Sequence, residues 1–349
     1  MIKKTVIIIT LLASSSVFAD KFIAIENNSD LLSLYSIDKV SGSLTKISQG
    51  SSIGHGPAGG VISPDNLSLF VFNGLSMNIA KFNLADIKNN KINNGSIVGQ
   101  IGVDTWGGAF TPDGSGLLVS ALAQNKIDYF SYNKTNGTIN KIKEIHLKYC
   151  NGGYGMTFVP NTNVMYLNCY NSNTIEKLSF SSSGNTYLEE KTIVLGNGFG
   201  SKPRGIMLDS TNKKAYISSE GTGAVYVYSY TPTTGEIGSP ITQISTNFGL
   251  LAGTLIDPFG NMIAIDRNAG SLNYYKKNSD GIYKDLVRSC HLGKTTLGSI
   301  NFDNNGHMYA ITRGDNSIAL YNVSADKCPH MVQNLTTTGM PFGLIRIND

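Results

Sequence analysis

The chain has 349 residues, of which only 15% are charged, and its formal net charge at pH 7 is +4. It has no run of five or more basic residues, so nothing in the sequence indicates a nucleic-acid or anionic-lipid partner. The 38 glycines, 17 tyrosines and 14 phenylalanines, together with short alternating apolar runs, favour an all-β protein.

The N-terminus has the three parts of a secretory signal peptide. Lys3 and Lys4 form a basic region, residues 6–12 are an apolar core, and Val17-Phe18-Ala19 is a small-residue cleavage site. The apolar run is too short to span a bilayer, and no later stretch approaches 18 apolar residues. We therefore expect residues 1–19 to be removed and the rest to be periplasmic or secreted, without a membrane span. Removing the two lysines lowers the formal charge from +4 to +2.

A repeat begins near residue 58 and continues to the end of the chain. Each copy has a glycine at its second position, followed by an apolar run, and successive glycines lie 48, 48, 50, 48, 45 and 45 residues apart; they are Gly59, Gly107, Gly155, Gly205, Gly253, Gly298 and Gly343. The apolar run ends in a turn such as Pro64-Asp65-Asn66 or Pro112-Asp113-Gly114, in which Asn or Gly can adopt a positive φ.

The copies predict the fold. Each has four strands in about 47 residues, which is the size of a propeller blade. The segment from Phe22 lacks an inner strand, whereas residues 342–347 supply only an inner strand. The sequence therefore predicts one domain over residues 20–349, a seven-bladed β-propeller closed by pairing of the C-terminal strand with the N-terminal strands, so that no open edge remains.

The seven repeat glycines have a structural interpretation. Inner strands crowd toward the axis of a propeller, and a residue without a side chain allows close approach of the backbones. They are not a phosphate-binding loop, because no strand–GxGxxG–helix context surrounds them.

The repeat pattern resembles the lactonase-like and YVTN-type seven-bladed propellers. Catalytic members of the lactonase family have Pro-Arg-His before one inner strand and Asn-Glu after the next strand. This chain keeps Pro203, Arg204 and Glu220, but Gly205 stands at the histidine position and Ser219 at the asparagine position. A second segment of the family is matched by Arg313, Gly314, Ser317 and Ile318. The missing histidines, including a pair absent before an earlier inner strand, favour binding over acid–base catalysis.

The loops before the inner strands and after the second strands of a propeller meet at one mouth of its channel, which is the usual ligand site of the fold. The repeat places charged residues of blades 5 to 7 and aromatic residues of blades 3 and 4 there. We expect the ligand-binding residues to be Arg204, Arg267, Arg313, Asp266, Trp106, Tyr154 and Tyr170.

These residue types suit a small anionic or cyclic ligand. Arginine binds carboxylate or phosphate with two parallel hydrogen bonds, and aromatic faces pack against rings. Glu220 could act as a general base on water. The alternative is that the same charges form ion pairs between blades and hold no ligand.

The four cysteines can form disulfides in an exported protein. Cys150 and Cys169 both lie near the predicted mouth, so we expect them to pair, and by elimination Cys290 pairs with Cys328. The histidines and cysteines nowhere have the spacing of a zinc site, and no acidic loop matches the pattern of a calcium-binding EF-hand. We therefore expect neither a metal nor a cofactor.

Three functions remain open. The first is an exported monomeric propeller that binds a small anionic ligand or a protein partner without catalysis. The second is a lactonase-like hydrolase of a sugar-acid or related cyclic ester, with Glu220 as its catalytic residue. The third is a scaffold in the cell envelope or in host contact.

Overall fold

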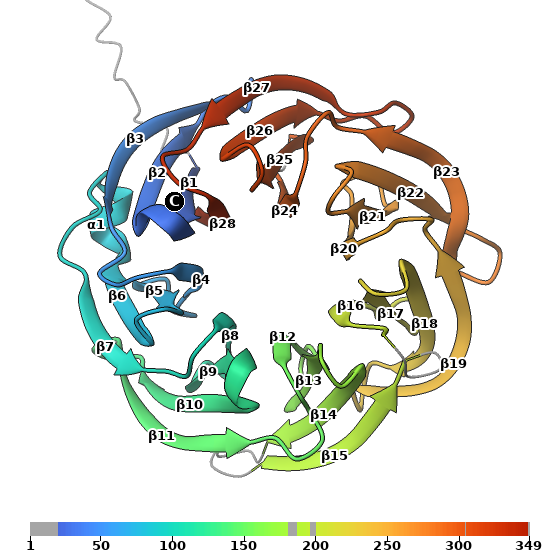
Figure 1. The fold of residues 1–349 in the computed structure, drawn as a ribbon, viewed down its shortest axis with the longest axis horizontal. Helices are drawn as coiled ribbons and strands as arrows, with labels where there is room; N and C mark the ends of the chain where they lie inside the picture. Colours follow the sequence, from blue (N-terminus) through green and yellow to red (C-terminus); the bar gives the residue numbers. More distant parts are fainter. Residues whose placement is uncertain (1–19, 181–186, 196–199, 304, 348–349) are drawn as a thin grey trace, which may run out of the picture.

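The computed structural model describes residues 20–180, 187–195, 200–303 and 305–347. These residues form seven four-stranded antiparallel sheets arranged around a central axis (Figure 1). The predicted seven-bladed β-propeller is therefore confirmed. The predicted signal peptide lies outside the described residues. Within the described part of the chain, no helix is long and apolar enough to cross a membrane.

The strands of each blade follow one another from the channel outward. Blades 1 to 4 consist of β28 (Pro341–Ile347), β1 (Lys21–Glu26), β2 (Leu31–Ile37) and β3 (Leu44–Ser51); β4 (Pro57–Ile62), β5 (Ser68–Asn73), β6 (Asn78–Asn83) and β7 (Ser96–Gln100); β8 (Thr105–Phe110), β9 (Gly116–Ala121), β10 (Lys126–Asn133) and β11 (Thr138–His146); and β12 (Gly153–Phe158), β13 (Val164–Cys169), β14 (Thr174–Phe180) and β15 (Tyr187–Val194).

The remaining blades follow the same order. Blades 5 to 7 consist of β16 (Pro203–Asp209), β17 (Lys214–Ser219), β18 (Ala224–Thr231) and β19 (Glu236–Ser245); β20 (Leu251–Ile256), β21 (Met262–Asp266), β22 (Ser271–Lys277) and β23 (Tyr283–His291); and β24 (Leu297–Phe302), β25 (His307–Thr312), β26 (Ser317–Asn322) and β27 (His330–Thr336). Short helical segments follow β1, β6 and β9: η1 (Asn27–Ser29), α1 (Leu84–Lys88) and η2 (Leu122–Gln124).

The core lies between neighbouring blades. Phe70 and Phe72 of β5, for example, pack in one cluster with Leu117 and Val119 of β9 and Phe130 of β10. The second strand of a blade is covered on both faces, and for this reason all six residues of β5, β9 and β13 are buried. The inner strands β4, β8 and β24 are mostly half-buried because one side of each faces the channel.

The predicted turns connect the first two strands of each blade. Asn66 and Gly114 have φ angles of +57° and +69°, as their turns require. The carboxylate of Asp65 accepts hydrogen bonds from the Ser63 hydroxyl at 2.6 Å and from the Tyr132 hydroxyl of the next blade at 2.7 Å. The turn thus also links two blades.

The ring closes between the two ends of the described chain. β28 pairs antiparallel with β1, with Phe22 opposite Arg346 and Ala24 opposite Leu344. Arg346 also forms an ion pair with Asp20. Blade 1 packs against blade 7 through the rings of Phe22 and Tyr309, whose centroids are 4.8 Å apart. The predicted closure by the C-terminal strand is confirmed.

The glycine interpretation holds at only some positions. A Cβ atom at Gly59 would lie 3.1 Å from the backbone oxygen of Trp106 in the next blade, so close backbone approach does favour glycine there. At Gly107 and Gly253, however, a Cβ atom would meet nothing within 4 Å. Crowding was therefore the wrong explanation for these two residues, because the channel is open beside them.

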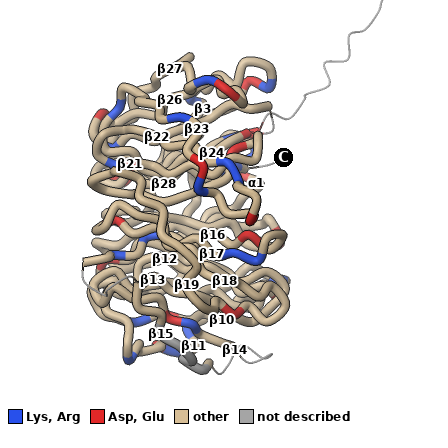
Figure 2. Tube along the Cα trace, turned by 90° about the vertical axis from the view of Figure 1, so that its right-hand side faces the viewer, with Lys and Arg blue, Asp and Glu red and all other residues tan. Residues whose placement is uncertain are grey.

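The two faces of the disc differ in their loops. Figure 2 shows the disc edge-on, with α1 on its right-hand side. The loops that follow the second strands, including η1 and η2, lie on the opposite face, which is turned toward the viewer in Figure 1. We call this opposite face the mouth.

The closing strand should contribute strongly to stability. Leu344 of β28 is 7% exposed within the cluster between blades 1 and 7, so Leu344→Asp would bury an unpaired carboxylate. We expect a loss of about 3 kcal/mol or more in the free energy of unfolding, measured by urea denaturation. The matched control is Leu286→Asp, because Leu286 is 54% exposed on the outer strand β23. Equal unfolding midpoints for the two variants would contradict the assigned role of β28.

Candidate functional site

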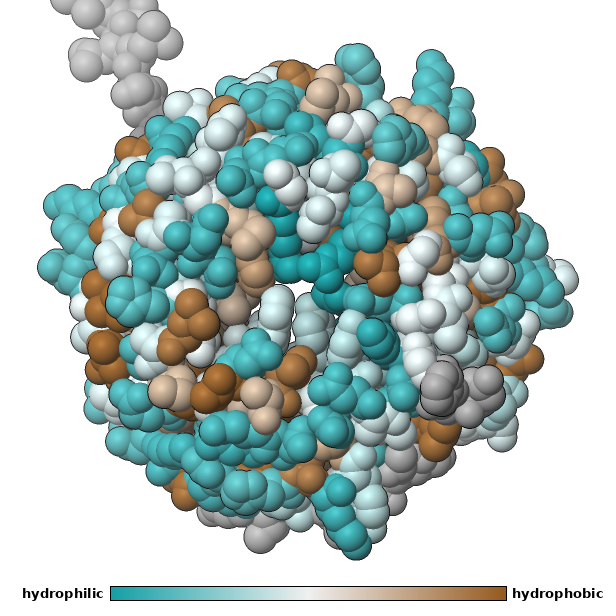
Figure 3. Space-filling model, in the orientation of Figure 1, coloured by the Kyte–Doolittle hydropathy of each residue, from teal (hydrophilic) through white to brown (hydrophobic). Residues whose placement is uncertain are grey.

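A cavity of about 300 Å³ opens at the mouth, between blades 4 to 7. Its polar wall consists of Tyr154, Arg204, Arg267 and Arg313, which come from four successive blades. Residues of β20 and β24, together with Ile265 of β21, form the rest of its lining, which includes the open position at Gly253. In the space-filling view, a hollow marks the centre of this face, with strongly hydrophilic residues along its border (Figure 3).

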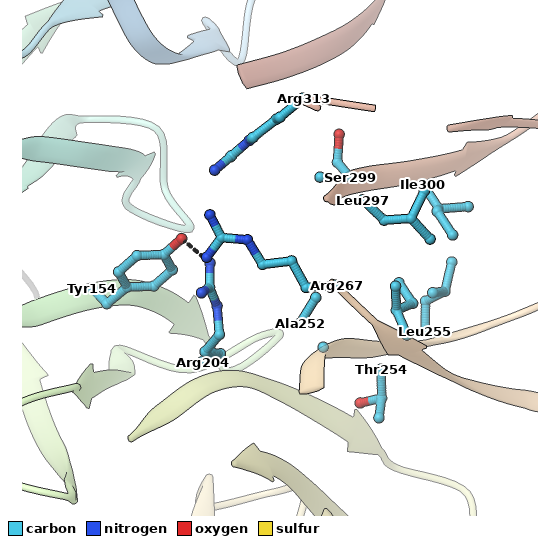
Figure 4. A pocket seen from close by; sticks show the side chains of 13 residues that line it. Tyr154, Arg204, Ala252, Thr254, Leu255, Arg267, Leu297, Ser299, Ile300 and Arg313 are labelled. Carbon is cyan, nitrogen blue, oxygen red and sulfur yellow. Dashed lines mark hydrogen bonds between the residues drawn. The ribbon is translucent and has the colours of Figure 1, made fainter. Parts of the chain in front are cut away.

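The three arginines converge on this cavity (Figure 4). Arg204 lies in β16 just before its repeat glycine, whereas Arg267 and Arg313 directly follow the second strands β21 and β25. The alternation of side chains along β16 directs the guanidinium of Arg204 toward the axis. The loops after β21 and β25 direct those of Arg267 and Arg313 the same way. Figure 4 shows all three groups pointing toward one another.

Arg204 and Glu220 form a buried ion pair within blade 5. Their side chains are only 9% and 7% exposed. A second nitrogen of Arg204 donates to the hydroxyl oxygen of Tyr154, and the hydroxyl of Tyr170 donates to the other carboxylate oxygen of Glu220 at 2.7 Å. Both oxygens of Glu220 are thus engaged by neighbouring side chains.

These contacts determine the protonation of the pair. Burial opposes ionisation of Glu220, but the Arg204 guanidinium and the Tyr170 hydroxyl outweigh it and hold the pKa of this carboxyl below its ordinary value. Burial and the neighbouring Glu220 raise the pKa of Tyr170 to about 12. At neutral pH the site therefore contains a carboxylate, a guanidinium and a neutral phenol.

Arg313 has a different environment. Its guanidinium packs over the ring of Phe342 at 3.9 Å from the centroid and lies 5.9 Å from that of Trp106. Its buried Nε atom has no hydrogen-bond partner among the described residues. Burial, together with the positive charges of Arg267 and Arg204, lowers the pKa of Arg313 to about 10.

The three guanidinium groups differ in their ion pairing. Within the described part of the chain, the side chains of Arg267 and Arg313 form no ion pair, whereas Arg204 has Glu220. Asp315, which is near Arg313 in sequence, pairs with Lys294 at 3.2 Å instead. The cavity wall therefore has three positive charges and a single adjacent negative charge.

A row of aromatic rings continues from the arginines. The ring centroids of Tyr170 and Tyr154 are 6.0 Å apart, those of Tyr154 and Trp106 are 5.6 Å apart, and those of Trp106 and Phe342 are 5.4 Å apart. Arg204 lies over Tyr154 at 4.6 Å. Cation–π contacts of this kind stabilise guanidinium groups that have left water.

The expected site residues have different positions. Arg204, Arg267, Arg313 and Tyr154 line the cavity, whereas Trp106 and Tyr170 flank it through contacts with Tyr154. Asp266 does not line it: its carboxylate accepts the backbone N–H groups of Asn268 and Ala269 at 2.9 and 3.0 Å and so shapes the loop after β21.

Phe342 was not among the expected ligand residues, although it stands directly before Gly343 and so occupies the repeat position of Trp106 and Tyr154. Its place in the repeat is the sequence feature that could have identified it as a site residue. The role of Phe342 as a surface for Arg313 depends on where the closing strand places it, which became visible only in the folded ring.

Both expected disulfides are present, Cys150–Cys169 and Cys290–Cys328. The first joins the loop before β12 to the end of β13, directly beside Tyr170 and a few residues from Tyr154. It therefore restrains both tyrosines of the site. The second joins β23 of blade 6 to the loop before β27 of blade 7. No group of three or more His, Cys, Asp or Glu side chains in the described residues could hold a metal ion.

The buried pair predicts a pH dependence. Since the folded pKa of Glu220 lies below 4.5, its contribution to stability is complete above pH 4.5 and is lost as the pH falls through the folded value. We expect Glu220→Gln to lower the free energy of unfolding by about 2 kcal/mol at pH 7, with a smaller difference from wild type at pH 3. Urea denaturation at the two pH values measures both effects.

Asp285→Asn provides the control, because Asp285 is exposed on β23 and its side chain forms no hydrogen bond or ion pair with the described residues. It should change stability little at either pH. A Glu220→Gln deficit that does not shrink on acidification would contradict the assigned protonation state.

Comparison with protein families gives a match over the middle of the chain. The family described as Lactonase, 7-bladed beta-propeller matches residues 108–237, from β8 to the start of β19. This range includes Tyr154, Arg204 and Glu220, but not Arg267 or Arg313. No curated protein matches the chain.

Solved structures share the fold over nearly the whole chain. A putative 6-phosphogluconolactonase from Bacteroides fragilis NCTC 9343 has a TM-score of 0.79 at 14% identity and covers 96% of this chain and 99% of its own. The periplasmic gluconolactonase of Pseudomonas aeruginosa has a TM-score of 0.80 at 12% identity, with coverages of 94% and 99%. Virginiamycin B lyase from Staphylococcus aureus has a TM-score of 0.60 at 16% identity, with coverages of 81% and 84%.

At these identities, the likeness to solved structures establishes the architecture and no activity. The family match adds a sequence pattern, which extends over blades 3 to 5. Together with the seven closed blades, it confirms the resemblance seen in the sequence: the chain is a seven-bladed β-propeller whose residues 108–237 match the lactonase propeller family.

Proposed function

We propose that the mouth of this propeller binds a small anion, a carboxylate or a phosphate ester, between Arg267 and Arg313. The observation that carries the proposal is that these two guanidinium groups line a cavity without a carboxylate partner among the described residues. Clustered, half-buried positive charges repel one another, and the lowered pKa of Arg313 reflects that repulsion together with its burial. A bound anion would reduce the repulsion and stabilise the charged form of Arg313.

The chemistry of the wall suits this ligand class. A guanidinium group can donate two parallel hydrogen bonds to one carboxylate or phosphate. Arg204 would help to position the anion while Glu220 and Tyr154 hold its guanidinium in place. The fold contributes rigidity, because each arginine is held by a different blade.

The state of Glu220 supports binding without turnover. A general base must accept a proton, but one oxygen of Glu220 is bound to Arg204 and the other to Tyr170. The same contacts lower its pKa and hence its basicity. We therefore assign Glu220 the role of positioning Arg204.

Hydrolysis of a lactone is the second candidate, favoured by the family match over residues 108–237 and by neighbours named as gluconolactonases. In that reaction Glu220 would take a proton from water as the water oxygen attacks the carbonyl carbon. The ring C–O bond then breaks, the alcohol oxygen takes the proton from Glu220, and the carboxylic acid that forms releases the second proton of the water to solvent. The product is a hydroxy acid whose carboxylate has the charge that the arginines would bind.

We further propose that the protein is an exported monomer with one domain over residues 20–349. Two disulfides and the absence of a membrane-spanning helix from the described residues agree with an extracytoplasmic location. A protein partner at the mouth and a scaffold role remain alternatives that no specific contact favours.

Anion binding is testable by isothermal titration with 6-phosphogluconate, which has a carboxylate and a phosphate. We expect Arg267→Ala and Arg313→Ala each to weaken binding about 10- to 100-fold, because each removes charge-assisted hydrogen bonds. The control is Lys276→Ala, which removes one positive charge from an exposed position on β22. Equal affinities for all four proteins would contradict the proposed site.

Turnover is tested separately with purified protein in a pH-stat, using glucono-δ-lactone and its 6-phosphate. Binding without catalysis predicts that acid release equals the spontaneous rate for wild type and for Glu220→Gln. Acid release that wild type accelerates and Glu220→Gln does not would establish the hydrolase and overturn the positioning role of Glu220.

A further inference from the structure

The mouth also has an apolar area, located over blades 2 and 3. Leu75 and Met77, in the loop between β5 and β6, are 76% and 41% exposed, and Val103, in the loop before β8, is 41% exposed. In Figure 3, apolar residues gather to the lower left of the central hollow, where Figure 1 places these two blades. We call Leu75, Met77 and Val103 the apolar rim.

The loops of the apolar rim are in direct contact with one another. The carbonyl oxygen of Met77 accepts the backbone N–H of Ile101 at 3.0 Å. The Cβ position of Gly74 faces the backbone of Thr105 at 3.3 Å. Thr105 immediately precedes Trp106, so the rim begins next to the aromatic row.

The aromatic row joins the rim to the arginines. Trp106 contacts Phe342 and Tyr154, and the guanidinium of Arg313 lies 5.9 Å from its ring centroid. Across the mouth, positive charge is thus followed by aromatic rings and then, past the Asp104 carboxylate that accepts the Trp106 Nε1–H at 2.7 Å, by exposed aliphatic side chains. Each part suits a different part of a single ligand.

We propose that the ligand is an amphiphile, with an anionic head between Arg267 and Arg313 and an aliphatic tail that crosses Trp106 onto the apolar rim. The proposal rests on the anion site described above and adds the tail. Single exposed apolar residues are common on protein surfaces. What carries the inference is the continuity of these three with the cationic cavity.

The size of the rim favours a small molecule over a protein. A stable protein interface buries about 800 Å² on each partner, and three side chains provide far less. They are sufficient to cover a short alkyl or acyl chain. The cavity of about 300 Å³ likewise fits a head group and not a folded surface.

Isothermal titration with two probes tests this arrangement, methyl phosphate and hexyl phosphate, which share a head and differ only in the tail. We expect wild type to bind hexyl phosphate at least about tenfold more tightly, since several methylene groups leave water. The double variant Leu75→Ser/Val103→Ser should lose this preference and keep the wild-type affinity for methyl phosphate. Leu286→Ser, an exposed leucine on the outer strand β23, should behave as wild type.

The possible outcomes distinguish binding of the aliphatic tail from binding of the anionic head. Equal binding of both phosphates by wild type would overturn the amphiphile and leave the anion site standing. A preference for hexyl phosphate that survives in the double variant would place the tail elsewhere and also overturn it. Failure of both probes to bind would overturn the anion site and this proposal together.

Discussion

The pairing of β28 with β1 is the interaction on which the rest of the molecule depends. Blades 4 to 7 each contribute one side chain to the polar wall of the cavity, and only a closed ring holds blades 5, 6 and 7 at the spacing that brings Arg204, Arg267 and Arg313 to it. The same pairing places Phe342 beneath Arg313. The closing strand is therefore both a structural element and a supplier of the site.

The charge distribution at the mouth follows from a few contacts. Arg204 is balanced by Glu220, which Tyr170 also holds, and this unit is buried and complete. Arg267 and Arg313 receive no such partner among the described residues, and aromatic rings take the place of a carboxylate beside Arg313. Partial removal of a charge from water is costly unless the charge is compensated, and a bound anion would provide that compensation. The contrast between the complete and the incomplete arginines is the basis of the functional proposal.

The repeat made the architecture, the closure and the convergence of the arginines predictable, because spacing determines which strand and which loop a residue occupies. Spacing does not determine where a side chain turns at the end of a strand. Asp266 has the same sequence signal as Arg267 but binds the backbone of its own loop. The repeat glycines appeared equivalent, yet Gly298 is packed against Ile311 while Gly253 borders open space. Such differences depend on contacts within each blade and its loops and on the width of the channel, which the spacing of the repeat does not encode.

The central claim is that an anion occupies the space between Arg267 and Arg313, and anomalous diffraction locates an anion most directly. Crystals of the purified protein soaked in selenate would be measured at the selenium absorption edge. We expect the strongest anomalous peak in the mouth cavity, within hydrogen-bonding distance of both guanidinium groups. An empty cavity, with selenate bound only at lysines on the outer strands, would contradict the central claim.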